Sequence, residues 1–91
     1  MALKVSVVTP EGGTAWEGDA DEVIIPAVTG EIGILPGRQP VLAALGNGEI
    51  RVKNSGEVLY KRRVTDGIAS VDSDNVTIVI DEIEESLVSA R

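Results

Sequence analysis

The stretch that decides the fold of this chain reads GEIGILPGRQPVLAAL and spans residues 30–45. It holds three of the ten glycines and two of the four prolines. Gly and Pro each destabilise a helix interior, by about 1 and about 3 kcal/mol, and neither Pro36 nor Pro40 can donate to a central β ladder. The stretch therefore predicts a shaped connection, with glycines where φ is positive or where another backbone approaches closely.

The apolar run from Val41 to Leu45 ends this connection, and two structures remain open for it. A short buried strand and a helical turn fit equally well, because periodicity cannot separate them over five residues. The connection itself also has two interpretations. It is either a recognition surface or a tight corner of a β-sandwich that only packs.

Composition limits the class of protein. The chain has 91 residues, which favours a single domain, and it is 43% hydrophobic and 25% charged, as globular domains are. No run approaches the roughly 18 apolar residues of a membrane span, and the N-terminus does not resemble a signal peptide. A net charge of −7 disfavours nucleic acid and anionic lipid as partners and favours a basic protein.

Short β-branched runs separated by turn residues dominate the rest of the chain. We expect strands over residues 3–9, 14–17, 20–27, 49–53, 57–64, 68–71 and 76–80. A turn at Asn54-Ser55-Gly56 predicts a hairpin, and Gly18-Asp19 predicts a break between the second and third strands. Turns at this spacing are typical of an all-β antiparallel sandwich or barrel. Residues 83–91 form a tail in which Ile83 and Leu87 could start a helix.

The residues that usually carry chemistry are scarce. Histidine and cysteine are absent, which excludes the common catalytic triads and thiolate metal sites. Asp72 to Asn75 resembles the opening of a calcium loop, but Thr77 stands where that loop requires glycine, so a turn is the better interpretation. We therefore expect no catalytic, cofactor-binding or metal-binding residue. The basic run Lys61-Arg62-Arg63 predicts a charged edge strand or a subunit contact.

The segment from Gly30 to Leu45, in the form GEIGILPGxxPxLxAL, resembles the hallmark segment of the ε subunit of bacterial F-type ATP synthase, called δ in mitochondria. Residues 7–11, 16–18, 66–71 and 75–79 resemble other parts of this family, in collinear order over about residues 3–80. The resemblance implies an antiparallel sandwich of about ten short strands in two five-stranded sheets. It also implies a non-catalytic central-stalk rotor subunit that binds γ and the c ring and helps couple proton translocation to ATP synthesis. Such a subunit is peripheral, at the cytoplasmic face of the bacterial inner membrane.

Two features depart from the family pattern. Arg38 and Gln39 follow Pro-Gly where the family usually has His, so a titratable position becomes permanently cationic. Most members also carry a C-terminal helical hairpin, which in this chain is missing or barely begun. We expect a sandwich domain over residues 1–82 and a tail over 83–91, without the inhibitory and nucleotide-binding functions of the hairpin.

The resemblance and the glycine-rich connection together predict one subunit-contact site. We expect Glu31, Ile32, Gly33, Gly37, Arg38 and Gln39 at the contact with the ring and γ, supported by Val41 and Leu42. Two other functions remain open from the residues alone. One is a stand-alone acidic β-sandwich that binds an unrelated basic protein, and the other is a small enzyme that uses a carboxylate pair.

Overall fold

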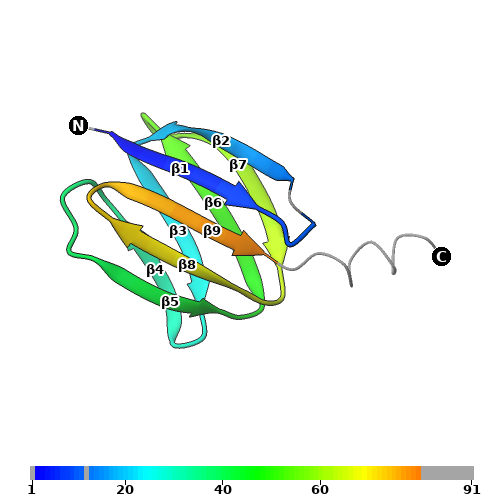
Figure 1. Ribbon diagram of the computed structural model, residues 1–91. Coiled ribbons are helices and arrows are strands. Elements are labelled where there is room, and N and C mark those ends of the chain that lie inside the picture. The colour runs from blue at the N-terminus through cyan, green and yellow to red at the C-terminus, as the bar shows by residue number, and fades with distance from the viewer. Residues whose placement is uncertain (1, 12, 81–91) are drawn as a thin grey trace.

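The computed structural model describes residues 2–11 and 13–80, and these form nine β-strands (Figure 1). The strands are β1 (Leu3–Val8), β2 (Thr14–Ala20), β3 (Glu22–Ala27), β4 (Gly30–Ile34), β5 (Val41–Leu45), β6 (Gly48–Asn54), β7 (Glu57–Val64), β8 (Gly67–Asp72) and β9 (Asn75–Ile80). Val41–Leu45 is therefore a strand rather than a helical turn. The possible helix start in the tail lies outside the described residues.

The strands form two layers that cross in Figure 1. Hydrogen bonding follows the order β2-β1-β9-β8-β5-β3-β6-β7, and β4 pairs with the other edge of β3. A single residue pair, Ala27 with Leu45, joins β3 to β5, so the sheet turns a corner there. One layer is β2-β1-β9-β8-β5 and the other is β4-β3-β6-β7. The expectation of an all-β sandwich is confirmed, with nine strands in the described residues rather than about ten.

One strand pair departs from the antiparallel expectation. β1 and β9 run parallel, from Lys4 opposite Asn75 to Val8 opposite Val79, whereas every other pair is antiparallel. Short turns impose antiparallel pairing only on strands that are consecutive in the chain. β1 and β9 are the first and last strands described, so no turn sets their direction.

The core between the layers is aliphatic and follows the predicted alternation. Leu3, Val5 and Val7 of β1 are buried, as are Ile50 and Val52 of β6. The other buried hydrophobic residues are Ala20, Val23, Ile25, Ile34, Leu45, Val64, Ala69, Val71, Val76, Ile78 and Ile80. Burial at about 25 cal/mol per Å² of apolar surface is the main stabilising term for such a sandwich.

The expected break at Gly18-Asp19 is wrong, because β2 runs without interruption from Thr14 to Ala20. Gly18 pairs with Val5 inside the ladder and lies against the ring of Trp16. A Cβ at position 18 would come within 2.9 Å of Trp16 Cη2, so the glycine makes room for the ring. That ring packs against the core and stacks on Tyr60, with centroids 5.7 Å apart.

The shaped connection is shorter than predicted. Gly30 to Ile34 form β4, which pairs with β3 across a turn at Val28 and Thr29, and only residues 35–40 are irregular. The predicted hairpin between β6 and β7 is confirmed, with a two-residue turn in which Ser55 and Gly56 have φ of 54° and 81°. Positive φ at both turn residues is the geometry that suits the twist of a hairpin.

Candidate interaction surface

Residues 35–40 cross from one layer of the sandwich to the other, because β4 lies in one and β5 in the other. Pro36 and Gly37 form a turn in which Gly37 has a φ of 87°, a conformation that favours glycine. Arg38 and Gln39 follow, outside any strand, and both are exposed. The loop lies at the same end of the sandwich as the β8–β9 turn, away from the end of β9 (Figure 1).

A hydrogen bond ties this loop to the β8–β9 turn. The backbone N–H of Gly37 donates to Oδ1 of Asp74 over 2.8 Å. This contact could not be predicted from the sequence, because the two residues are 37 positions apart and the pattern around Asp74 indicates only a turn.

Glu31 and Gly33 lie on the outer face of the β4-β3-β6-β7 layer. Glu31 Oε2 accepts a hydrogen bond from Arg51 Nη2 over 2.9 Å, in an ion pair whose side chains are both partly exposed. Such an exposed pair contributes at most about 1 kcal/mol to folding. Glu31 is thus a charged surface residue that a partner can reach.

Gly33 is exposed and is not explained by the fold. Unlike Gly30 and Gly37, it does not have a positive φ. A Cβ built on it would meet nothing closer than 3.6 Å, where Glu22 Oε2 would make an ordinary contact. Glycine weakens a strand interior, and one that packing does not require often marks the close approach of another backbone.

Ile32 and Val41 point inward and pack against the core, so both support the surface from beneath. Leu42 was expected to do the same, but its side chain is 76% exposed. It projects from the outer face of the β2-β1-β9-β8-β5 layer. Leu42 is therefore available for direct contact.

An apolar row crosses this second outer face. Pairing places Ala44 of β5 opposite Ile68 of β8, Ile68 opposite Val79 of β9, and Val79 opposite Val8 of β1. Ile68 is 53% exposed and Val79 is 40% exposed. Leu42 lies one outward position along β5 from Ala44. We call Leu42, Ala44, Ile68, Val79 and Val8 the apolar row.

Ile68 and Val79 were not predicted as surface residues. In both strands an apolar residue occupies an outward position where the alternation would place a polar one. This break in the pattern was the signal that could have identified the two surface residues. A shallow hollow of about 370 Å³ adjoins the row and is lined by Pro10, Asp66, Gly67, Ile68, Val79 and Ile80.

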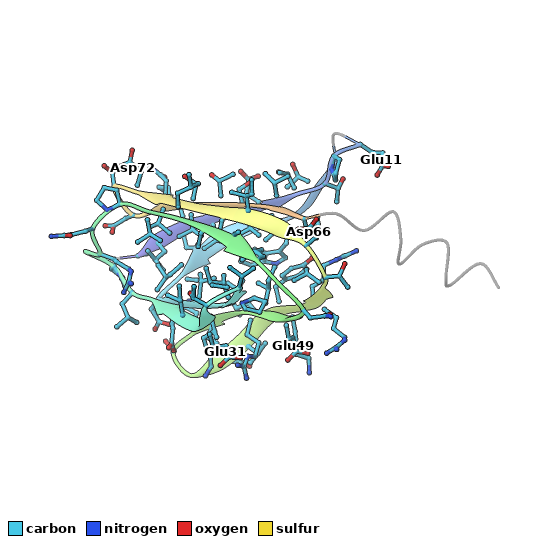
Figure 2. All side chains as sticks on the ribbon, turned by 90° about the horizontal axis from the view of Figure 1, so that it is seen from below. Glu11, Glu31, Glu49, Asp66 and Asp72 are labelled. Carbon is cyan, nitrogen blue, oxygen red and sulfur yellow. The ribbon has the colours of Figure 1, made fainter. Side chains whose placement is uncertain are left out.

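The predicted contact residues therefore do not form one flat patch. Figure 2 shows Glu31 on one broad face of the sandwich and Asp72 on the other. Leu42 lies on the same face as Asp72, because it pairs with Ser70, whose side chain points to the same side of β8 as that of Asp72. Gly37, Arg38 and Gln39 lie on the loop between the two faces. The predicted contact residues therefore extend around one end of the sandwich, from one outer face to the other.

The basic run lies where an edge strand was predicted, because β7 ends the strand order. Lys61 and Arg63 are exposed, whereas Arg62 is half-buried and its Nη1 donates to the hydroxyl of Tyr60 over 3.4 Å. The edge-strand prediction is confirmed. A subunit contact by this strand stays a prediction.

The described residues show no cluster of three or more His, Cys, Asp or Glu that could hold a metal ion. In the same part of the chain, no polar or charged side chain is fully buried, and no helix is long and apolar enough to cross a membrane. What the surface offers is shape, exposed apolar side chains and exposed charge.

Residues 2–86 match the family described as the β-sandwich domain of the ATP synthase Delta/Epsilon chain. The chain belongs to this family. An ATP synthase epsilon chain of Synechococcus sp. (strain JA-2-3B'a(2-13)) is 43% identical over 84 residues, which cover 92% of this chain and 60% of the relative. The epsilon chain of Nostoc sp. (strain PCC 7120 / SAG 25.82 / UTEX 2576) is 42% identical over 81 residues, or 88% of this chain and 58% of the relative. This Delta/Epsilon sandwich thus spans about 60% of the length of such relatives.

Two solved structures share the fold. A chain in the Euglena gracilis mitochondrial ATP synthase, in a structure of OSCP, F1 and the c ring, superposes with a TM-score of 0.75 at 20% identity and covers 98% of this chain and 61% of its own. A chain in the central stalk and c ring of the Tetrahymena thermophila enzyme gives a TM-score of 0.70 at 17% identity, covering 89% and 64%. The Delta/Epsilon sandwich predicted from the sequence is therefore the fold of this chain.

Proposed function

We propose that this chain is the sandwich part of an ATP synthase epsilon subunit that binds γ and the c ring and helps couple proton translocation to ATP synthesis. Its family and its epsilon-chain relatives support an ATP synthase role. The solved structures that share its fold come from ATP synthase assemblies with the c ring, one of them also with the central stalk. The role is non-catalytic, and the protein acts by holding rotor parts together.

Gly33 carries this proposal. Its backbone is accessible on the outer face of β4, and nothing within the fold requires a glycine there. A partner whose backbone lies directly on β4 would require it, because any side chain would hold the two surfaces apart. We therefore assign Glu31, Gly33, Gly37, Arg38 and Gln39 to the contact, with Ile32 and Val41 supporting it.

The two faces beside the loop differ in chemistry and so suit different partners. The apolar row, which includes Leu42, suits a lasting contact with γ, because burial of apolar surface gives affinity to a permanent interface. The face of Glu31 and Arg51 is charged and suits polar loops of the c ring, where charge complementarity fixes orientation. An adaptor that joins two partners needs two such faces.

The placement in the cell follows from the same role. The subunit lies peripherally at the cytoplasmic face of the bacterial inner membrane, which it reaches through the c ring. The division into a sandwich domain over residues 1–82 and a tail over 83–91 stays a prediction, because residues 81–91 lie outside the described residues.

The test is Gly33→Val, compared with Gly13→Val. Valine favours strands, and the space above Gly33 accepts a Cβ, so the variant should fold with an unchanged or slightly higher Tm. It should lose co-elution with the c ring in size-exclusion chromatography, because Gly33 lies on the face proposed for the ring, and it should keep co-elution with γ. Gly13 is an exposed glycine in the β1–β2 connection, also without positive φ, and its variant should co-elute as the unaltered chain does.

Normal co-elution of the Gly33→Val variant with the c ring would show that no partner lies on β4. If the unaltered chain itself fails to co-elute with γ, the stand-alone binding module becomes the better interpretation of the fold.

A further inference from the structure

Two turns of the sandwich have the same backbone shape but differ at one residue. In the β6–β7 turn, Ser55 and Gly56 have φ of 54° and 81°. In the β8–β9 turn, Ser73 and Asp74 have φ of 51° and 65°. Both are two-residue hairpin turns that start with serine. Glycine adopts a positive φ most readily, so Gly56 fits its turn and Asp74 is the exception.

Asp and Asn tolerate the left-handed conformation better than other side chains, but glycine needs no such tolerance. The backbone of the β8–β9 turn therefore gives no reason to prefer aspartate at position 74. A residue that is locally second best often serves a contact elsewhere in the structure.

The contact that Asp74 makes is with the loop of the proposed interface. Its Oδ1 accepts the hydrogen bond from the Gly37 N–H over 2.8 Å, and its backbone carbonyl accepts one from the Lys4 N–H, also over 2.8 Å. One residue thus joins the turn, the start of β1 and the loop. Among the described residues, and outside the strand ladders, no second hydrogen bond ties residues 35–40 to the sandwich.

The remainder of the loop has little else to hold it. Leu35 is 55% exposed, and Arg38, Gln39 and Pro40 are exposed as well. Pro36 is half-buried, but the rest of the loop has little packing and has to be ordered when a partner binds, which weakens affinity. A hydrogen bond that orders the loop beforehand removes part of this penalty.

We propose that Asp74 is a positioning residue that holds the loop of residues 35–40 in the conformation that its partner binds. The carboxylate fixes Gly37 and thereby sets the direction in which Arg38 and Gln39 leave the sandwich. The inference rests on the proposed function, because it takes this loop to be part of the γ contact.

The experiment uses Asp74→Gly in the 91-residue chain. Glycine suits the φ of position 74, so the variant should keep its Tm, yet it lacks the acceptor for Gly37. Asp74→Asn keeps an Oδ1 acceptor and should restore the contact. Asp72→Asn removes the same charge two residues earlier, where no hydrogen bond to the loop exists.

Three quantities are measured for each variant: the hydrogen-exchange rate of the Gly37 amide, the Kd for isolated γ subunit, and the Tm. In Asp74→Gly we expect Gly37 to exchange about fivefold faster and γ to bind about fivefold more weakly, as loss of one hydrogen bond implies. Asp74→Asn and Asp72→Asn should stay within about twofold of the unaltered chain for both quantities, a range well below one lost hydrogen bond.

Two results with Asp74→Gly would overturn the proposal. Unchanged exchange at Gly37 would show that Asp74 does not hold the loop. Faster exchange with unchanged γ affinity would show that the held conformation does not matter for binding. Absence of γ binding by the unaltered chain would refute the proposed function, and this role of Asp74 with it. Loss of γ binding by the unaltered chain is distinct from the other two results, because those are seen only with the Asp74→Gly variant.

Discussion

Leu42→Ser tests the apolar row at its most exposed residue. The Leu42 side chain is 76% exposed, so its removal should change the free energy of unfolding of the isolated chain by less than about 0.5 kcal/mol. Burying a whole leucine side chain contributes about 1.5 to 3 kcal/mol. Burying the exposed three quarters against γ should therefore contribute about 1 to 2 kcal/mol, or about 5- to 30-fold in Kd.

The assay is titration calorimetry of the chain against isolated γ, with urea unfolding to confirm equal stability. Leu59→Ser is the matched control, because it makes the same chemical change at a leucine that is 42% exposed on β7, in the other layer. Leu42→Ser should weaken γ binding, whereas Leu59→Ser should leave it unchanged. If the two variants bind γ equally well, the apolar row is not the γ contact and the reasoning from its exposure fails.

Two further substitutions test the structure around the site. Gly67→Ala should lower the free energy of unfolding by about 2 to 4 kcal/mol in urea, because φ is 155° and the new Cβ would collide with the carbonyl oxygen of Val79; an unchanged urea midpoint would contradict this packing. Glu31→Gln breaks the ion pair with Arg51 and should change stability by less than about 1 kcal/mol, with less effect still in 1 M salt. A larger loss of stability, measured in the same way, would show that the ion pair contributes more to folding than an exposed pair usually does.

The parts of the fold that could be predicted are those set by neighbouring residues. Asn54-Ser55-Gly56 determines a hairpin because the turn itself fixes the pairing of β6 with β7. The inward positions of β1 and β6 followed from alternation. β4 was missed because Gly30, Gly33 and Pro36 read as loop, although pairing with β3 overrides the weak propensity of the glycines.

Contacts between distant parts of the chain could not be predicted. In the sequence Gly18 indicates a turn, whereas in the fold it leaves space for the Trp16 ring. The bond between Gly37 and Asp74 depends on how two loops meet at one end of the sandwich. The motif therefore indicated residues for the proposed contact, but not that they lie on two faces of the sandwich or that Leu42 points outward.

The parallel pairing of β1 with β9 has a consequence for synthesis of the protein. Lys4 pairs with Asn75, so this contact closes a loop of about 70 residues at an entropic penalty on the order of 4 kcal/mol. β1 leaves the ribosome before β9 and must wait for it, while the β6–β7 hairpin can form locally in microseconds. Slow maturation, with the edge of β1 exposed to chaperones in the meantime, is the expected result of placing both ends of the sandwich side by side.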